Sequence, residues 1–331
     1  MASRGKVLVT GAGGFIGCHL VTHLKRQGYW VRGADFKYPD FSSHNAHNAD
    51  DFLLLDLRRQ DACLEATRDI DEVYALASDT GGSGFLSSRK AGTTHNNVLI
   101  GLRTLEAART RHIKRFLYAS SLSVANDPSQ DLSSIISSSA DSDFLVRQQT
   151  ARVEQQLGEY LCFQYGVDHN LETRIVRLPN VFGPFSPWEG GRERAPAALC
   201  RKIALAKLTS SPDIEIWGDG QQTRTFCYID DCVSALHQAM QSSYPISAIL
   251  GGSPPFTINQ IADIIIQIAG IQVSKRYLHD LGHHEQFIPH ETDLPLVVGL
   301  EPPTSIEQGL ANIYAWIEER VRVHLLNLRN N

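Results

Sequence analysis

Short apolar runs alternate with longer amphipathic stretches along the first half of the chain. The runs end at Gly, Asp or Ser, and the stretches between them repeat apolar residues at helical spacing. Alternation of this kind predicts an α/β fold in which helices cover both faces of a doubly wound parallel sheet. The predicted strands are Val7–Thr10, Trp30–Asp35, Phe52–Leu55, Glu72–Leu76, Phe116–Ser120 and Glu172–Arg177.

Helical periodicity predicts two long helices between the later strands, at Gly92–Arg111 and Phe144–Tyr165. The interval Ser129–Ser142 is about half serine, with several aspartates, so it cannot bury a face and is predicted to be a loop. An amphipathic helix is predicted near the C-terminus, at Ala311–Leu328, where it serves packing.

The pattern changes after Asn180 to loops rich in Pro and Gly, with shorter helices and isolated strands. We therefore predict a sheet domain over residues 1–178 and mainly a smaller substrate-binding lobe over residues 179–331. The lobe is expected to be discontinuous, because Cys227–Ile249 has a strand, helix, strand pattern. This part, about residues 225–250, could return to the main sheet.

Composition narrows the classes of partner. The 331 residues include 31 basic and 36 acidic ones, a net charge of −5, which gives no overall cationic surface for nucleic acid. No apolar stretch approaches the roughly 18 residues that a membrane span needs. The six cysteines are scattered without a Cys-x-x-Cys pair, and no apolar leader precedes the first strand. We expect a cytoplasmic protein with a small-molecule substrate.

Three glycines follow the first strand at a spacing of three residues. Gly11, Gly14 and Gly17 come directly after a strand and open a helix. Gly11 permits a tight turn, Gly14 lets backbone N–H groups approach a pyrophosphate, and Gly17 lets the helix pack closely on the strand. This context predicts a Rossmann-type dinucleotide site.

Asp35 closes the second strand, 18 residues after Gly17. A carboxylate there accepts hydrogen bonds from an adenosine ribose and repels a 2′-phosphate, which favours NAD(H) over NADP(H). Arg32 and Lys37 lie nearby in sequence and leave the 2′-phosphate as an alternative.

Further segments at the strand ends resemble the extended short-chain dehydrogenase/reductases, of the NAD-dependent epimerase/dehydratase family. These are Asp56-Leu57, Leu76-Ala77 and Tyr118-Ala-Ser-Ser121.

Within that family, three more segments look like the GDP-mannose 3,5-epimerases. They lie at residues 79–85, 183–202 and 217–226, and the likeness covers roughly residues 5–320.

The resemblance implies an NAD-bearing sheet domain and a lobe that holds a nucleotide sugar. It assigns cofactor contacts to Gly11, Gly14, Phe15, Ile16, Gly17, Asp35, Asp56, Leu57, Leu76 and Ala77. It assigns substrate contacts to Gly81, Asn180, Glu193, Lys202, Gln222 and Arg224. The positions of the catalytic set are Ser121, Ser123 and Arg194. No metal site is implied.

The chain departs from the family where hydride chemistry needs its acid and base. The family uses Tyr-x-x-x-Lys, in which the lysine lowers the tyrosine pKa. Here none of the ten tyrosines is followed by a lysine four residues later. Aligning the family motif with this chain needs a gap in the serine-rich loop, and the gap can be placed in three ways. The Tyr and Lys positions then fall on Phe144 and Gln148, on Val146 and Thr150, or on Arg147 and Ala151.

Two further catalytic positions differ. Ser123 replaces an acid/base cysteine and is a much weaker acid, while Arg194 replaces a lysine and does not readily exchange a proton at neutral pH. Ser121 remains and could hydrogen-bond a substrate oxygen. Asp79 and Asp143 are possible acids by location only.

The histidines between residues 279 and 290 could ligate a metal, but the glycine and proline among them favour a polar loop.

Three functions stay open at this point. The first is an NAD(H)-dependent oxidoreductase on an epimerase-like scaffold that acts on a nucleotide sugar or a redirected carbonyl substrate. The second is an NADH-dependent ketoreductase of a non-sugar specialised metabolite. The third is a non-catalytic protein that binds NAD or another ligand, since loss of the acid/base set is what a pseudoenzyme would show. The family resemblance also makes a homodimer possible.

Overall fold

The computed structural model describes residues 4–40, 48–79, 90–125, 143–243, 246–248, 254–278 and 303–330. Its main sheet is parallel throughout, with the strand order β11-β6-β5-β4-β1-β2-β3. The strands are β1 (Lys6–Thr10), β2 (Trp30–Asp35), β3 (Asp51–Leu54), β4 (Glu72–Ala75), β5 (Arg115–Ser121), β6 (Glu172–Leu178) and β11 (Ile246–Ala248). The order runs outward in both directions from β1 and β4, which confirms the predicted doubly wound sheet and places a ligand crevice at the strand ends.

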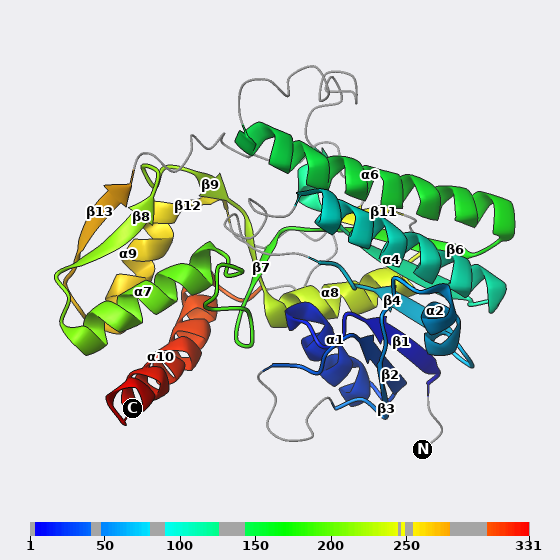
Figure 1. Cartoon of the computed structure of the whole chain (residues 1–331), viewed down its shortest axis with the longest axis horizontal. Coiled ribbons are helices and arrows are strands. Elements are labelled where there is room, and N and C mark those ends of the chain that lie inside the picture. Colours follow the sequence, from blue (N-terminus) through cyan, green and yellow to red (C-terminus); the bar gives the residue numbers. More distant parts are fainter. Residues whose placement is uncertain are drawn as a thin grey trace.

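Helices cover both faces of this sheet (Figure 1). Packed on one face are α1 (Phe15–Arg26) and α8 (Ile229–Gln241); on the other are α2 (Gln60–Ala66), α4 (Lys90–Thr110) and α6 (Asp143–His169). The alternation within β1 explains the two cores, because successive side chains point to opposite faces. Val7 and Val9 are buried against α1, whereas Leu8 is buried in the cluster that α4 and α6 cover.

The second lobe is built around three helices that pack on one another, at the left of Figure 1. These are α7 (Ala195–Thr209), α9 (Ile258–Ala269) and α10 (Ile306–Asn330). Two small sheets flank them, formed by β8 (Asp213–Trp217) with β13 (Ser274–Leu278) and by β9 (Thr223–Arg224) with β12 (Phe256–Thr257). Smaller C-terminal sheets therefore accompany the main sheet, as the fold class predicted.

Residues 225–250 contribute one strand to the main sheet and one strand outside it. Strand β11 pairs with β6, and α8 packs against α1. The first strand of the segment, β10 (Phe226–Tyr228), instead pairs with β7 (Asn180–Phe182) outside the main sheet. Pro179 separates β6 from β7, and because proline has no N–H to donate, it interrupts the ladder there.

No helix in the part of the chain that the structure describes is long and apolar enough to cross a membrane. All six cysteines lie in described segments and all are free thiols.

Candidate functional site

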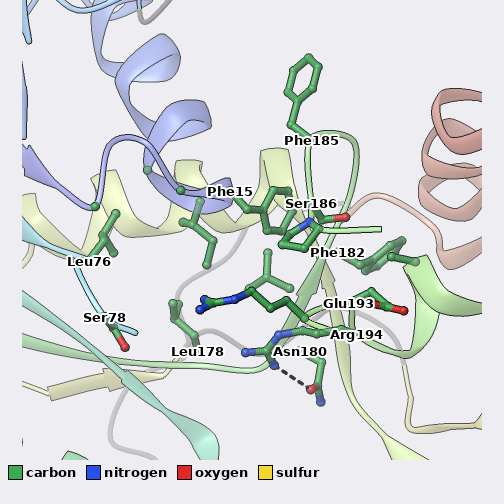
Figure 2. Close-up of a pocket in the computed structure, with 18 of the residues that line it drawn as sticks. Phe15, Leu76, Ser78, Leu178, Asn180, Phe182, Phe185, Ser186, Glu193 and Arg194 are labelled. Atoms are coloured by element: carbon green, nitrogen blue, oxygen red, sulfur yellow. Dashed lines mark hydrogen bonds between the residues drawn. The ribbon is translucent and has the colours of Figure 1, made fainter. Parts of the chain in front are cut away.

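A cavity of about 1960 Å³ lies between the strand ends of the main sheet and the second lobe. In Figure 2, Leu76 and Ser78 lie on the sheet side of this cavity, and Glu193 and Arg194 on the lobe side. It is lined by all the site residues named from the sequence whose side chains the structure describes: Gly11, Gly14, Phe15, Ile16, Gly17, Asp35, Asp56, Leu57, Leu76, Ala77, Ser121, Asn180, Glu193, Arg194, Lys202, Gln222 and Arg224. Gly81 and the side chain of Ser123 lie outside the described part, as does the histidine segment.

The glycine turn at the start of α1 leaves no room for side chains. A Cβ atom on Gly17 would lie 2.1 Å from the Gly11 carbonyl oxygen, and one on Gly11, whose φ is +72°, would lie 2.9 Å from the Ala77 nitrogen. Helix α1 begins at Phe15 without a side-chain cap from Gly14. Its first backbone N–H groups are therefore available to an anion, and the turn fits a dinucleotide pyrophosphate.

Asp35 is held at the end of β2 by the same turn. The Gly13 N–H donates to Asp35 Oδ2 at 2.9 Å, and the Lys37 N–H donates to Oδ1 at 3.3 Å. Burial raises the pKa of Asp35, while these backbone hydrogen bonds oppose the rise. The sequence analysis missed Gly13, whose Cβ would lie 2.2 Å from the Lys37 carbonyl oxygen; the Gly13-Gly14 doublet was the available signal.

The two cations near Asp35 have carboxylate partners of their own. Arg32 donates to Asp51 at 2.7 Å, and Lys37 is ion-paired with Asp40. Neither side chain is left as an uncompensated charge beside Asp35. The residues present thus fit a dinucleotide without a 2′-phosphate.

A largely buried ion pair joins α6 to β6 beside the end of β5. Arg177 donates to both carboxylate oxygens of Glu159, at 2.9 and 2.6 Å. Ser120 Oγ donates to Glu159 at 2.6 Å and to Gln155 Oε1 at 3.3 Å. These contacts hold α6 against β5 directly beside Ser121, which lines the cavity.

Helix α6 contributes two cavity-lining residues among those described, Glu154 and Gln155. Glu154 is hydrogen-bonded to the side chain of Asn97, and burial together with the negative charge of Asp79 raises its pKa to about 7. The sequence analysis missed both residues because it tested this helix for a phenol and an ammonium group, and the only acids that it considered were Asp79 and Asp143. The registers that it considered fall on residues 144–151, whose side chains are outside the described part.

The packing of α6 on β5 needs a glycine. A Cβ atom on Gly158 would lie 2.2 Å from the Tyr118 hydroxyl, so the Tyr118 ring fits under the helix only because Gly158 has no side chain. Burial raises the pKa of Tyr118, which keeps this phenol neutral. Tyr118 is therefore a packing residue.

On the lobe side, Arg194 lies within the cavity without a carboxylate partner among the described residues. It precedes α7 and donates to Asn180 Oδ1 at 3.4 Å, the bond dashed in Figure 2. Arg194 is solvent-exposed, and partial desolvation by the protein groups around it lowers its pKa. Arg224 is similar: it donates to the Thr223 carbonyl oxygen at 2.7 Å, and burial lowers its pKa.

The other cations of the lobe are engaged. Arg201 pairs with Glu193 at 2.9 Å, and Lys202 donates to the Glu215 carbonyl oxygen at 2.7 Å beside the Trp217 ring. Several buried oxygens close by have no hydrogen-bond partner: Glu193 Oε2, Gln222 Oε1, Thr223 Oγ1 and Thr225 Oγ1. Buried polar atoms are normally satisfied, so this set fits a ligand that brings hydroxyl groups.

No group of three or more His, Cys, Asp or Glu side chains is placed to hold a metal ion within the described ranges.

Comparison with known sequences gives consistent matches. A sequence model of the NAD dependent epimerase/dehydratase family matches residues 7–247. The chain is 35% identical over 324 residues to GDP-mannose 3,5-epimerase 1 of Oryza sativa subsp. indica, covering 96% of this chain and 82% of that protein. It is 34% identical over 320 residues to the GDP-mannose 3,5-epimerase of Arabidopsis thaliana, covering 96% and 83%.

Solved structures share the fold. A UDP-glucose 4-epimerase from Thermotoga maritima with UDP-glucose has a TM-score of 0.72 at 20% identity, covering 96% of this chain and 99% of that one. A UDP-glucuronic acid 4-epimerase from Bacillus cereus, in complex with UDP-glucuronic acid and NAD, has a TM-score of 0.69 at 27% identity, covering 95% and 99%.

Proposed function

Because the chain belongs to the NAD-dependent epimerase/dehydratase family, we propose that it is an NAD(H)-dependent oxidoreductase whose substrate is a nucleotide sugar. The relatives named above include GDP-mannose 3,5-epimerases and epimerases solved with UDP-sugars. The observation that carries the proposal is the division of the cavity. Its sheet side has the shape of a dinucleotide site, and its lobe side presents guanidinium groups without carboxylate partners among the described residues, beside unsatisfied oxygens.

The sheet side would hold NAD(H). The N–H groups at the start of α1 would bind the pyrophosphate, and Asp35 would accept hydrogen bonds from the adenosine ribose. The partners of Arg32 and Lys37 favour NAD over NADP, because neither cation is left for a 2′-phosphate. Bound NADH would supply a hydride to a carbonyl carbon, and bound NAD⁺ would accept one from a carbinol carbon.

The lobe side would hold the nucleotide sugar. Arg194 and Arg224 are fixed donors for its anionic groups, since guanidinium binds phosphate and carboxylate oxygens with two parallel hydrogen bonds. The unsatisfied oxygens of Gln222, Thr223 and Thr225 would accept hydrogen bonds from sugar hydroxyls. Ser121 at the end of β5 would contact the oxygen at the reacting carbon.

A ketoreductase acting on a non-sugar carbonyl is the second candidate. The observation that favours it is the missing Tyr-x-x-x-Lys pair. Oxidation of a sugar carbinol needs a base to take the hydroxyl proton, whereas reduction of a reactive ketone is less demanding. The third candidate, a protein that binds NAD without chemistry, predicts no hydride transfer at all.

Hydride transfer separates these candidates. The purified chain is incubated with NAD⁺ and GDP-mannose, and the appearance of NADH fluorescence and of changed sugars by mass spectrometry is measured. Sugar-dependent NADH or a changed sugar supports the proposal. Oxidation of NADH by simple ketones without a sugar response favours the ketoreductase, and no transfer under either condition contradicts an enzyme.

We also propose that the chain forms a homodimer through α6. Its outer face exposes large apolar side chains at helical spacing: Leu157, Tyr160, Phe163 and Val167. Contiguous apolar surface of this kind marks an association site. Light scattering of the wild type and of Phe163→Glu tests this, with a dimer that dissociates in the variant as the expected result. A monomeric wild type contradicts the proposal.

A further inference from the structure

Glu154 lies on α6 and lines the cavity. Its neighbour Gln155 accepts the hydrogen bond from Ser120, and both α6 residues line the cavity together with Ser121. Glu154 is therefore one residue away from the contact that joins α6 to the end of β5. No assignment made from the sequence used this carboxyl group.

Its surroundings come from three elements besides α6. Helix α4 contributes Asn97, which is hydrogen-bonded to Glu154, and β5 contributes the neutral phenol of Tyr118. The segment after β4 contributes Asp79. The Asp79 N–H donates to Asn97 Oδ1 at 2.6 Å, and Asn97 Nδ2 donates to the Asp79 carbonyl oxygen at 3.3 Å.

Asp79 itself faces the second lobe, where its carboxylate pairs with Arg192 at 3.4 Å. The charged neighbour of Glu154 is therefore an acid, Asp79. The cation Arg192 pairs with the Asp79 carboxylate. Burial and the charge of Asp79 together disfavour ionisation, which is why the pKa of Glu154 rises to about 7. A carboxyl in this state exchanges protons readily at neutral pH.

Three other carboxylates that line the cavity are paired with cations. The pairs are Asp56 with Arg58, Glu193 with Arg201 and Lys37 with Asp40. Asp35 is occupied by the N–H groups of Gly13 and Lys37. Glu154 differs from all of these because its own contact is a neutral amide.

Resting on the proposed hydride chemistry, we propose that Glu154 is the proton donor and acceptor for the substrate oxygen, in the role for which the chain lacks a phenol. In reduction, the carbonyl carbon gains a hydride from NADH and the C=O π pair becomes a lone pair on oxygen. That oxygen takes the proton from the Glu154 carboxyl group. The carboxylate then regains a proton from solvent, and oxidation of a carbinol runs through the same steps in reverse.

The first test measures the titration of Glu154 directly and needs no substrate. Carbon-13 carboxyl NMR of the glutamate-labelled full chain is recorded against pH for the wild type and Glu154→Gln, which identifies the resonance. The expected midpoint is near 7, and Asp79→Asn is expected to lower it because a negative neighbour is removed. A midpoint at the ordinary value of 4.5 overturns the proposal.

The second test follows NADH formation from NAD⁺ and GDP-mannose. Glu154→Gln is expected to lower the rate about 100- to 10,000-fold and to leave NAD affinity unchanged. The matched control is Asp168→Asn, an exposed acid on the same helix and outside the cavity, which is expected to keep the wild-type rate. A wild-type rate in Glu154→Gln overturns the assignment.

If Glu154→Gln does not fold, Glu154→Asp replaces it, because this variant keeps the acid but shortens its reach, and a rate equal to wild type again overturns the assignment. Absence of any hydride transfer by the wild type contradicts the proposed function instead. The NMR midpoint still decides in that case whether Glu154 holds a proton at neutral pH.

Discussion

The charged side chains on the two sides of the cavity differ in whether they have partners inside the protein. On the sheet side, charged groups have partners inside the protein: Glu159 with Arg177, Arg32 with Asp51, and Asp35 with backbone N–H groups. On the lobe side, Arg194 and Arg224 line the cavity without a carboxylate partner in the described structure, beside oxygens that lack hydrogen bonds; Arg224 is partly buried and Arg194 is solvent-exposed.

A cation that lines a cavity without a carboxylate partner contributes no ion pair to the stability of the fold, so its presence is better explained by a ligand than by folding. In the proposed function, the sheet side holds the cofactor and the lobe side recognises the substrate. The comparison predicts that removing a charge on the sheet side lowers the free energy of unfolding. Removing an unpaired cation on the lobe side should instead weaken substrate binding and leave the free energy of unfolding unchanged or higher.

The largest expected effect is on the paired side. Glu159→Gln leaves Arg177 enclosed without its counter-charge and removes a partner of Ser120. Breaking a buried pair in this way is expected to lower the free energy of unfolding by about 3–5 kcal/mol. Urea denaturation measures it. A loss below about 1 kcal/mol would show that the pair behaves like an exposed one.

The glycine turn is expected to come next. Gly17→Ala places a Cβ 2.1 Å from the Gly11 carbonyl oxygen, so the turn must open and the pyrophosphate site is distorted. NAD affinity by calorimetry is expected to fall about 100-fold or more, equivalent to about 2.7 kcal/mol.

The matched control is Gly92→Ala in α4, where the added Cβ meets no atom within 4 Å. Its NAD affinity should equal that of the wild type, and the free energy of unfolding should rise by about 0.5–1 kcal/mol through helix propensity. Equal NAD affinity in both variants would contradict the pyrophosphate assignment.

Removing the unpaired cation should separate stability from binding. Arg194→Met is expected to leave the free energy of unfolding unchanged or higher, because no described carboxylate loses a partner. Affinity for GDP-mannose in the presence of NAD should fall roughly 10- to 100-fold, the range for hydrogen bonds to a charged group.

Arg276→Met is the control for the same lobe: Arg276 lies on β13, pairs with Glu215 of β8 and does not itself line the cavity. It should change neither quantity. Destabilisation by Arg194→Met with unchanged sugar affinity would reverse the interpretation and make Arg194 a structural residue.

The last expected effect depends on pH. The pKa of Glu154 in the folded protein, about 7, lies above its ordinary value of 4.5. The raised pKa therefore does not affect the free energy of unfolding below pH 4.5, and it lowers this free energy progressively as pH rises from 4.5 towards 7. Glu154→Gln removes this cost, so its melting temperature should match the wild type at pH 4.5 and exceed it at pH 8. Parallel melting curves across this range would contradict the raised pKa.

The local parts of the cofactor side were readable from the sequence. The glycine turn and Asp35 follow from strand ends and a fixed spacing, and the structure places Gly11, Gly14, Gly17 and Asp35 on one cavity. Because the strand, the turn and the helix are adjacent in sequence, their relative positions in the fold can be predicted from the spacing of their residues. Even there, the contact of Gly13 with Asp35 needed the folded turn.

The candidate acid/base group could not be predicted from the sequence in the same way. The serine-rich interval before α6 gives no anchor for the register of that helix, so three placements of the missing pair remained. The position of Glu154 depends on Asn97 from α4 and Asp79 after β4, which are distant in sequence and meet it only in the fold. Likewise, Arg194 and Arg201 look alike in the sequence, and only the contact of Arg201 with Glu193 distinguishes them.

The division of the cavity is tested most directly by calorimetric titration of the purified chain with NAD⁺, NADH, NADP⁺ and NADPH, followed by GDP-mannose on the tightest complex. The account predicts that NAD(H) binds more tightly than NADP(H), and that GDP-mannose then binds saturably to the complex. Binding of no dinucleotide, or equal binding of GDP-mannose by the wild type and Arg194→Met, would contradict it.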